Sequence, residues 1–209
     1  MTHVERDLAG RIVALVSPTG LRTSYSYDAC GRMVDVTDPA GRVTRYSYTS
    51  DFQVATVTYP TGETARYEYD AMGRVVLSHV PGAGVSQYRY DPCGRLVFSC
   101  DLVYGQRHFS YDLAGQLVAA TNPAGGVSRY GYDRCGRLVT RTDPGGGLTT
   151  YQYNECGQMI AATDPLGRVT EYTWDKSGTL AAITRPDGTV VSRRLGPKGV
   201  EEYIDDCLL

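Results

Sequence analysis

Carboxylates recur along this chain at a fixed spacing, and a row of carboxylates could bind calcium. The row consists of Asp7, Asp28, Asp70, Asp91, Asp112, Asp133 and Asp175, with Asn154 at one further position. Arginine often follows four residues later, at Arg11, Arg32, Arg74, Arg95 and Arg137. A cation at that place opposes the binding of a second cation, and asparagine serves a turn as well as aspartate does. The row therefore predicts side chains that cap turns, and no metal site.

The cysteines and histidines form no recognisable catalytic or redox motif. Four of the six cysteines share one repeat position, which alanine, methionine or serine fills elsewhere: Cys30, Cys93, Cys135 and Cys156, against Ala9, Met72, Ala114 and Ser177. Such a position does not require a disulfide, so reduced thiols are predicted. His3, His79 and His108 occupy three different repeat positions, and no His-x-x-x-His or Cys-x-x-Cys pair occurs. We predict no catalytic residue, no cofactor and no metal.

The elements that carry these residues repeat every 21 residues. The first aromatic position holds Tyr25, Tyr46, Tyr67, Tyr88, Phe109, Tyr130, Tyr151 and Tyr172. Two residues later, the second aromatic position holds Tyr27, Tyr48, Tyr69, Tyr90, Tyr111, Tyr132, Tyr153 and Trp174. The register extends from Val4 to Arg193, which makes about nine repeats. A fixed period of this length is typical of an array of stacked supersecondary units.

Each repeat contains two turn signals and two short strands. In the repeat that starts at Tyr25, Asp28–Gly31 and Asp38–Gly41 both begin with aspartate and end with glycine, a pattern that favours a hairpin turn with a bulge. Residues 32–37 are rich in β-branched side chains, and residues 42–48 alternate with period two. We therefore predict an all-β antiparallel array of hairpin repeats that coils as a spiral strip or partial shell, because long twisted sheets curl.

Composition excludes several classes of protein. The chain has 209 residues, a net charge of −2 and a pI near 5.9, which argue against binding to nucleic acid or to an anionic membrane. No apolar run is long enough for a transmembrane helix, so no membrane insertion is predicted. The first seven residues lack the pattern of a secretory signal. The expectation is a cytoplasmic chain as synthesised, belonging to a parent protein that is secreted or displayed at a cell surface.

The repeat pattern breaks at a few places, and these lead to further expectations. Phe52 replaces the turn glycine, so that loop is expected to take another form. The array is assigned to residues 1–193 and an irregular acidic tail to residues 194–209. The segment 12–16 is expected to form an unguarded N-terminal edge that pairs with another strand.

One repeat carries a family pattern: Tyr130-Gly131-Tyr132-Asp133-Arg134-Cys135-Gly136-Arg137-Leu138-Val139, then Thr142-Asp143-Pro144. This string resembles the Rhs family, also called YD-repeat proteins, and the resemblance covers residues 4 to 193. It implies a β-strip that spirals into a hollow shell, which encloses a C-terminal toxin in bacterial Rhs proteins and toxin complexes and serves adhesion in teneurins. Nine repeats are fewer than a full shell needs, so a partial shell is expected.

Two functions follow as hypotheses. The first is a non-enzymatic structural module, part of a shell that encapsulates or presents toxin cargo. The alternative is an adhesion module that binds carbohydrate or protein through its tyrosine-rich face, since stacked aromatics serve either packing or ligand binding. The expected partners are other repeats or a cargo domain of a longer chain, a further copy through the edge strands, or a glycan.

Overall fold

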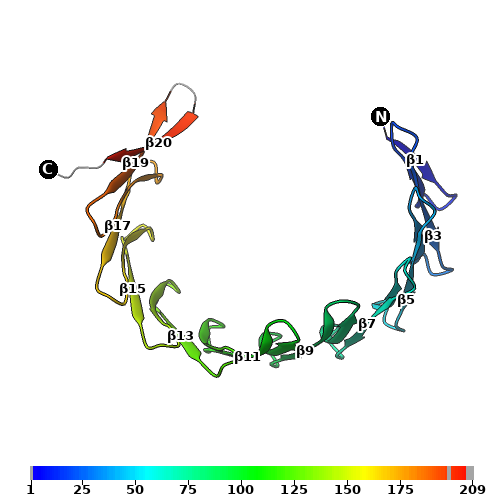
Figure 1. Ribbon diagram of the computed structural model, residues 1–209, viewed down its shortest axis with the longest axis horizontal. Coiled ribbons are helices and arrows are strands. Elements are labelled where there is room, and N and C mark those ends of the chain that lie inside the picture. Colours follow the sequence, from blue (N-terminus) through cyan, green and yellow to red (C-terminus); the bar gives the residue numbers. More distant parts are fainter. Residues whose placement is uncertain (1, 197–198, 206–209) are drawn as a thin grey trace. The chain divides into compact units, whose positions relative to one another are not determined.

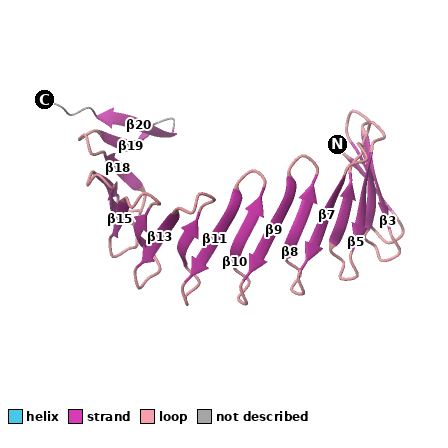
Figure 2. Cartoon of the chain, turned by 60° about the horizontal axis from the view of Figure 1, so that its bottom comes forward, coloured by secondary structure: helices cyan, strands magenta, loops and turns pink. Residues whose placement is uncertain are grey.

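The computed structural model describes residues 2–196 and 199–205, and the regular elements among them are β-strands (Figure 2). The chain divides into two units, residues 1–106 and 107–209. The first unit contains β1 (His3–Arg6), β2 (Ile12–Val16), β3 (Arg22–Tyr27), β4 (Met33–Thr37), β5 (Val43–Tyr48), β6 (Val54–Thr58), β7 (Thr64–Tyr69), β8 (Val75–Val80), β9 (Gly84–Tyr90) and β10 (Leu96–Asp101).

The second unit follows the same plan. Its strands are β11 (Gly105–Tyr111), whose first two residues precede the unit, β12 (Leu117–Thr121), β13 (Val127–Tyr132), β14 (Leu138–Thr142), β15 (Leu148–Tyr153), β16 (Met159–Thr163), β17 (Val169–Trp174), β18 (Leu180–Thr184), β19 (Val190–Gly196) and β20 (Gly199–Asp205). In the part of the chain that the structure describes, no helix could span a membrane.

Within each unit the strands pair antiparallel with their neighbours in the sequence, which makes a meander (Figure 1). Tyr25 lies opposite Val36, and one repeat later Tyr46 lies opposite Val57. The second unit repeats this register. The prediction of an all-β antiparallel array of hairpin repeats is confirmed.

The aspartate turns have the geometry that their sequence indicates. Gly31 has a φ of 82°, and its N–H donates to the Asp28 carbonyl at 3.0 Å. The Asp28 N–H donates to the Arg32 carbonyl at 2.9 Å. The ladder between β3 and β4 also slips by one residue between Ser26 and Tyr27. A tight turn closed by a left-handed glycine, with a bulge beside it, therefore closes the hairpin of β3 and β4. The turn at Asp38–Gly41 has the same backbone bonds, but the ladder between β4 and β5 has no register shift.

Phe52 contradicts one expectation, because its loop keeps the common form. Phe52 takes a φ of 67°, and its N–H donates to the Thr49 carbonyl at 3.2 Å. The Thr49 N–H donates to the Gln53 carbonyl at 2.8 Å, as in the other turns. The paired strands β5 and β6 flank this turn. They impose a left-handed backbone conformation that is unfavourable for phenylalanine. The prediction of another loop form is wrong for this reason.

The acidic end of the chain is also more regular than its sequence suggests. The prediction of an irregular tail over residues 194–209 is wrong for the described part, since β19 and β20 form an antiparallel pair. Arg193 lies opposite Glu202 and Arg194 opposite Glu201 in the ladder. Residues 206–209 lie outside the described residues.

The N-terminal edge is one strand further out than predicted. The segment Ile12–Val16 is an inner strand, because β1 pairs with it on one side and β3 on the other. Val4 lies opposite Leu15, and Ala14 is fully buried. The sequence of β1 is short and charged, so it lacks the apolar alternation that indicates a strand. Placing the unguarded edge at residues 12–16 is therefore wrong.

The sheet has almost no interior of its own. Among the described side chains, the buried hydrophobic residues are Ala14, Ala65 and Phe98, and no large side chain is completely buried. A single layer of sheet leaves both of its faces partly in water, and stable domains are built from at least two layers. Contacts between successive repeats must therefore supply much of the stability of each unit.

Candidate functional site at the junctions between repeats

The aspartates of the row cap turns, as predicted. Asp28 Oδ1 accepts hydrogen bonds from the backbone N–H groups of Cys30 and Arg32, both at 2.9 Å. Its Oδ2 accepts from Arg32 Nε at 2.6 Å. The same ion pair, with arginine four residues after aspartate, occurs at Asp7, Asp28, Asp38, Asp70, Asp91, Asp133 and Asp164. The carboxylates are thus occupied within their own turns.

These hydrogen bonds alter the acidity of the turn carboxyls. The backbone N–H of Arg137 and its guanidinium lower the pKa of Asp133 below its ordinary value of 3.8. Arg32 lowers the pKa of Asp28 in the same way. Among the described residues, no group of three or more His, Cys, Asp or Glu side chains could hold a metal ion. Asp28 and Asp133 are therefore structural groups of their turns.

The arginine of each turn also reaches the next repeat. The Cζ atom of Arg32 lies 5.0 Å from the centre of the Tyr48 ring, and that of Arg137 lies 4.9 Å from the Tyr153 ring. Arg137 Nη1 additionally donates to the Asn154 carbonyl at 3.1 Å. We call this arrangement the arginine clamp, and its members are Arg11 over Tyr27, Arg32 over Tyr48, Arg74 over Tyr90 and Arg137 over Tyr153. It joins one hairpin to the next through a cation–π contact.

The second aromatic of each repeat completes the junction. The ladder between β2 and β3 ends at the pair Ala14 and Ser24. Ile12 lies two residues beyond Ala14 on the β2 side. Its carbonyl accepts a hydrogen bond from the Tyr27 hydroxyl at 2.6 Å. A side chain thus bonds to a carbonyl that lies beyond the end of the ladder between β2 and β3.

The same bond recurs at further junctions along the chain. The donors and carbonyls are Tyr27 with Ile12, Tyr48 with Met33, Tyr69 with Val54, Tyr90 with Val75, Tyr132 with Leu117, Tyr153 with Leu138, and Trp174 Nε1 with Met159. The distances run from 2.6 Å at Tyr48 to 3.1 Å at Tyr90. The bond links residues 15 positions apart.

Sequence reasoning missed this role, although a signal was present. The first aromatic position accepts phenylalanine at Phe109, whereas each residue at the second position is a tyrosine or Trp174. Only the second position therefore always carries an N–H or O–H donor. That difference separates an aromatic used for packing from an aromatic used for a specific hydrogen bond.

The remaining candidates are not brought together. Cys30, Cys93, Cys135 and Cys156 lie exposed at turns as free thiols, and Cys100 is half-buried on β10. The three histidines lie on three different strands, β1, β8 and β11. No thiol–imidazole pair follows from this placement among the described residues.

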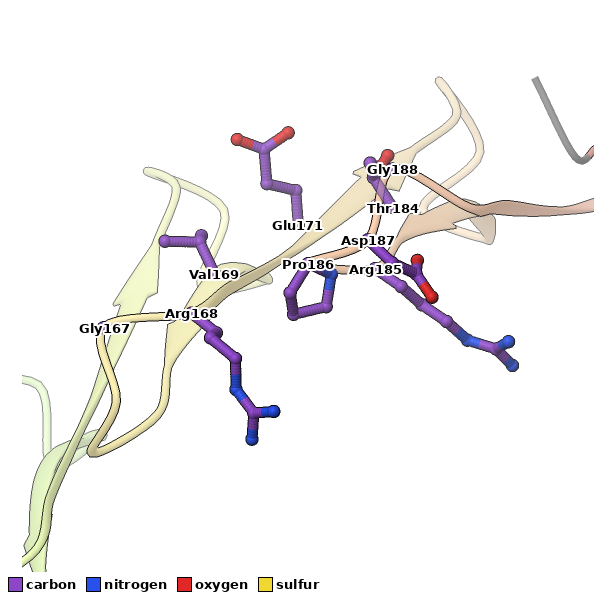
Figure 3. A pocket seen from close by; sticks show the side chains of 9 residues that line it. All are labelled: Gly167, Arg168, Val169, Glu171, Thr184, Arg185, Pro186, Asp187 and Gly188. Carbon is purple, nitrogen blue, oxygen red and sulfur yellow. The ribbon is translucent and has the colours of Figure 1, made fainter. Parts of the chain in front are cut away.

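Shallow grooves lie between neighbouring turns of the kind that Asp38–Gly41 forms, which is the second turn of each repeat. One groove of about 690 Å³ is lined by Gly167, Arg168, Val169, Glu171, Thr184, Arg185, Pro186, Asp187 and Gly188 (Figure 3). A second groove of about 460 Å³ lies five repeats earlier and includes Arg66 and His79 where the first has Glu171 and Thr184. Because the charge at equivalent positions changes sign, these grooves are a consequence of the repeat and do not form one repeated ligand site.

The geometry described so far defines a class of protein: a β-hairpin repeat array whose neighbouring hairpins are joined by an aspartate–arginine–tyrosine contact. The sequence profile of the Teneurin YD-shell family matches residues 2–189. The chain therefore belongs to the Teneurin YD-shell family, and it is a structural module of the Rhs/YD-repeat type.

Solved structures share the fold of this chain. The chain is similar to the crystal structure of TcdB2-TccC3, with 18% identity and a TM-score of 0.77 over 96% of this chain and 12% of that chain. It is also similar to TcdB2-TccC3 without its hypervariable C-terminal region, with 16% identity and a TM-score of 0.63 over 98% of this chain and 15% of that chain.

A third similar structure is the Photorhabdus luminescens Tc holotoxin pore, with 13% identity and a TM-score of 0.56 over 97% of this chain and 14% of that chain. The chain thus spans less than a sixth of the length of these structures. No curated protein matches it.

Proposed function

We propose that this chain is a segment of the wall of a YD shell, and that the shell encloses or presents toxin cargo. The observation that carries the proposal is the single-layer sheet, in which the buried hydrophobic residues of the described part are only Ala14, Ala65 and Phe98. A sheet of this kind leaves both faces partly exposed, which suits a wall that meets solvent on one side and an enclosed partner on the other. Membership of the YD-shell family supports the same role.

The wall acts without catalysis in this proposal. Its carboxylates are paired with arginines four residues away, and its exposed thiols have no imidazole beside them on the same turn. The second aromatics donate their polar hydrogens to backbone carbonyls, as Tyr48 does to Met33. These hydroxyls hold the wall together, so we do not carry forward the alternative of a glycan-binding tyrosine face.

Further repeats of a longer chain are the partners that fit the edges. In the described part of the chain, β1 pairs only with β2 and β20 only with β19. The free side of each strand offers backbone groups to another strand, either from a longer parent protein or from a second copy. We further propose that the parent protein is secreted or displayed at a cell surface, where a toxin would act.

The test has two stages. The first is to sequence the DNA that flanks this reading frame, where we expect further YD repeats and a downstream toxin segment. The second is to purify the complete product and digest it with a protease, while imaging it by electron cryomicroscopy. A hollow shell whose C-terminal segment resists digestion is the expected result. An extended particle whose C-terminal segment is cut as fast as the same segment expressed alone would refute the proposal.

A further inference from the structure

Two basic side chains face each other across one pair of strands in the first unit. Strands β7 and β8 are neighbours (Figure 2), and Arg66 on β7 lies directly opposite His79 on β8. Both residues line the groove of about 460 Å³. Facing residues of an antiparallel pair lie on the same side of the sheet, with Cβ atoms about 5 Å apart. We propose that Arg66 and His79 form a binding site for a divalent oxyanion, such as sulfate or a phosphate group.

The guanidinium of Arg66 is free to bind a ligand. One repeat earlier, Arg45 occupies the equivalent position, and its Nε lies 3.6 Å from the carboxylate of Asp35 on the neighbouring strand. Thr56 takes the place of this aspartate beside Arg66. In the described part of the chain, the exposed Arg66 has no ion-pair partner. Its N–H groups can therefore donate to the oxygens of an anion.

The imidazole of His79 adds a further donor and, when it is protonated, a second positive charge. The equivalent residue one repeat earlier is Thr58, which lies opposite Arg45. Histidine side chains change charge between about pH 5 and pH 8, and like charges at facing positions destabilise a sheet. An anion between Arg66 and His79 would remove this repulsion. We therefore expect tighter binding at pH 6 than at pH 8.

Nearby carboxylates limit the affinity of the site and make it depend on His79. Glu63 lines the same groove, and Glu68 lies on the same face of β7 as Arg66. From the other neighbouring strand, β9, the uncharged Val85 faces His79. The charges that line the groove thus sum to zero when His79 is neutral and to a positive value when it is protonated. Coulomb attraction to that positive charge is twice as large for a divalent anion as for a monovalent one.

The chain contains an internal control for this site. Arg129 occupies the position of Arg66 three repeats later, and it lies between Thr142 and Ala119 on its two neighbouring strands. It is an exposed arginine, as Arg66 is, but no imidazole faces it. Substitutions at Arg66 and Arg129 therefore remove the same charge from equivalent positions, and only one of them alters the proposed site.

NMR titration of the complete chain with sodium sulfate tests the proposal, with sodium chloride used to keep the ionic strength constant. The ring signals of the three histidines report binding, and His79→Asn identifies those of His79. At pH 6 we expect the His79 signals to shift along a saturable curve. At pH 8 we expect the affinity to be lower by about 3- to 5-fold. Sulfate keeps its charge between these pH values, so the change reports on the protein.

Three variants make the test specific. Arg66→Gln should weaken sulfate binding by about 3- to 5-fold, whereas Arg129→Gln should leave it unchanged. Glu63→Gln removes a carboxylate from the groove and should strengthen binding by about 2- to 5-fold. Equal binding by the Arg66→Gln and Arg129→Gln variants would overturn the proposal. So would His79 signals that do not saturate at pH 6.

A divalent oxyanion has two sources, a free ion and a phosphate group carried by a larger molecule. O-phosphoserine, titrated under the same conditions with serine as its control, distinguishes them. Tighter binding than that of sulfate assigns the site to a carried phosphate, and weaker binding assigns it to a free ion. Arg66→Gln should weaken the binding of whichever ligand is tighter, and unchanged binding of that ligand would refute the site.

Discussion

The Cζ atom of Arg137 lies 4.9 Å from the centre of the Tyr153 ring, which belongs to the next hairpin. The same arginine pairs with Asp133, four residues before it, at 2.6 Å. One guanidinium therefore connects a turn to itself and to its neighbour. Stability in a repeat array is the sum of such contacts within and between units.

The hydroxyl of the second aromatic is expected to stabilise the array, and that of the first is not. Tyr132→Phe removes the donor to the Leu117 carbonyl, which lies at 2.9 Å. We expect a loss of about 1 kcal/mol in the free energy of unfolding, because a half-buried carbonyl loses its partner. Tyr130→Phe is the control, since Phe109 fills the equivalent position in another repeat. Urea unfolding of both variants measures the difference, and equal midpoints would contradict the assigned bond.

The left-handed turn glycine should tolerate substitution much less than its neighbour. Gly136 has a φ of 82°, and a Cβ atom there would lie 3.0 Å from Gln116 Nε2 of the preceding repeat. Gly136→Val should cost about 1 to 3 kcal/mol from backbone strain. Cys135→Ala should change stability by less than about 0.5 kcal/mol, because that side chain is exposed. Thermal unfolding of the two variants provides the comparison, and matching melting temperatures would rule out the turn geometry.

The array should lose stability in acid. Hydrogen bonds from the turn lower the pKa of Asp28 and Asp133 in the folded chain below the ordinary value of 3.8. As the pH falls, the unfolded chain takes up protons first, so stability present above about pH 4 declines as the pH passes through the folded pKa values. Urea midpoints at pH 7, 4 and 3 should therefore decrease.

A variant isolates one carboxyl within this effect. Asp133→Asn should be less stable than the parent protein at pH 7, because the amide cannot form the ion pair with Arg137. The difference in the free energy of unfolding between the variant and the parent protein should become smaller below about pH 4, since a protonated carboxyl resembles an amide. A difference in the free energy of unfolding that stays constant between pH 7 and pH 3 would show that the charge of Asp133 does not contribute to stability.

Because β1 is the outer strand and β2 is an inner strand, substitutions in the two strands should have different effects on stability and self-association. Val13→Lys with Leu15→Lys places charges on the inner strand β2 and should destabilise the fold by more than about 1 kcal/mol. Val4→Lys places a charge on the outer strand, where Val4 is 41% exposed, and should reduce self-association with little loss of stability. Sedimentation over a wide concentration range, combined with urea unfolding, separates the two effects. Association that Val4→Lys leaves unchanged would exclude β1 as the pairing edge.

The sequence alone determined the hairpin repeat and its turn chemistry. Asp28, Gly31 and Arg32 lie within five residues of one another, so their types and spacing predict the cap, the left-handed residue and the ion pair. The two aromatic positions likewise indicate the period and the strands. Local preferences of this kind depend little on the rest of the chain.

The tertiary structure decided the contacts between repeats and three departures from the expected pattern. The Tyr48 hydroxyl meets the Met33 carbonyl 15 residues away only because the ladder between β4 and β5 ends before it. Phe52 takes a left-handed conformation because the paired strands on both sides of its turn impose it. Strands β1 and β20 form because a neighbouring strand offers backbone groups, which short charged sequences do not reveal. In each case the paired strand stabilises the observed conformation. That strand lies outside the short stretch of sequence from which a pattern is read.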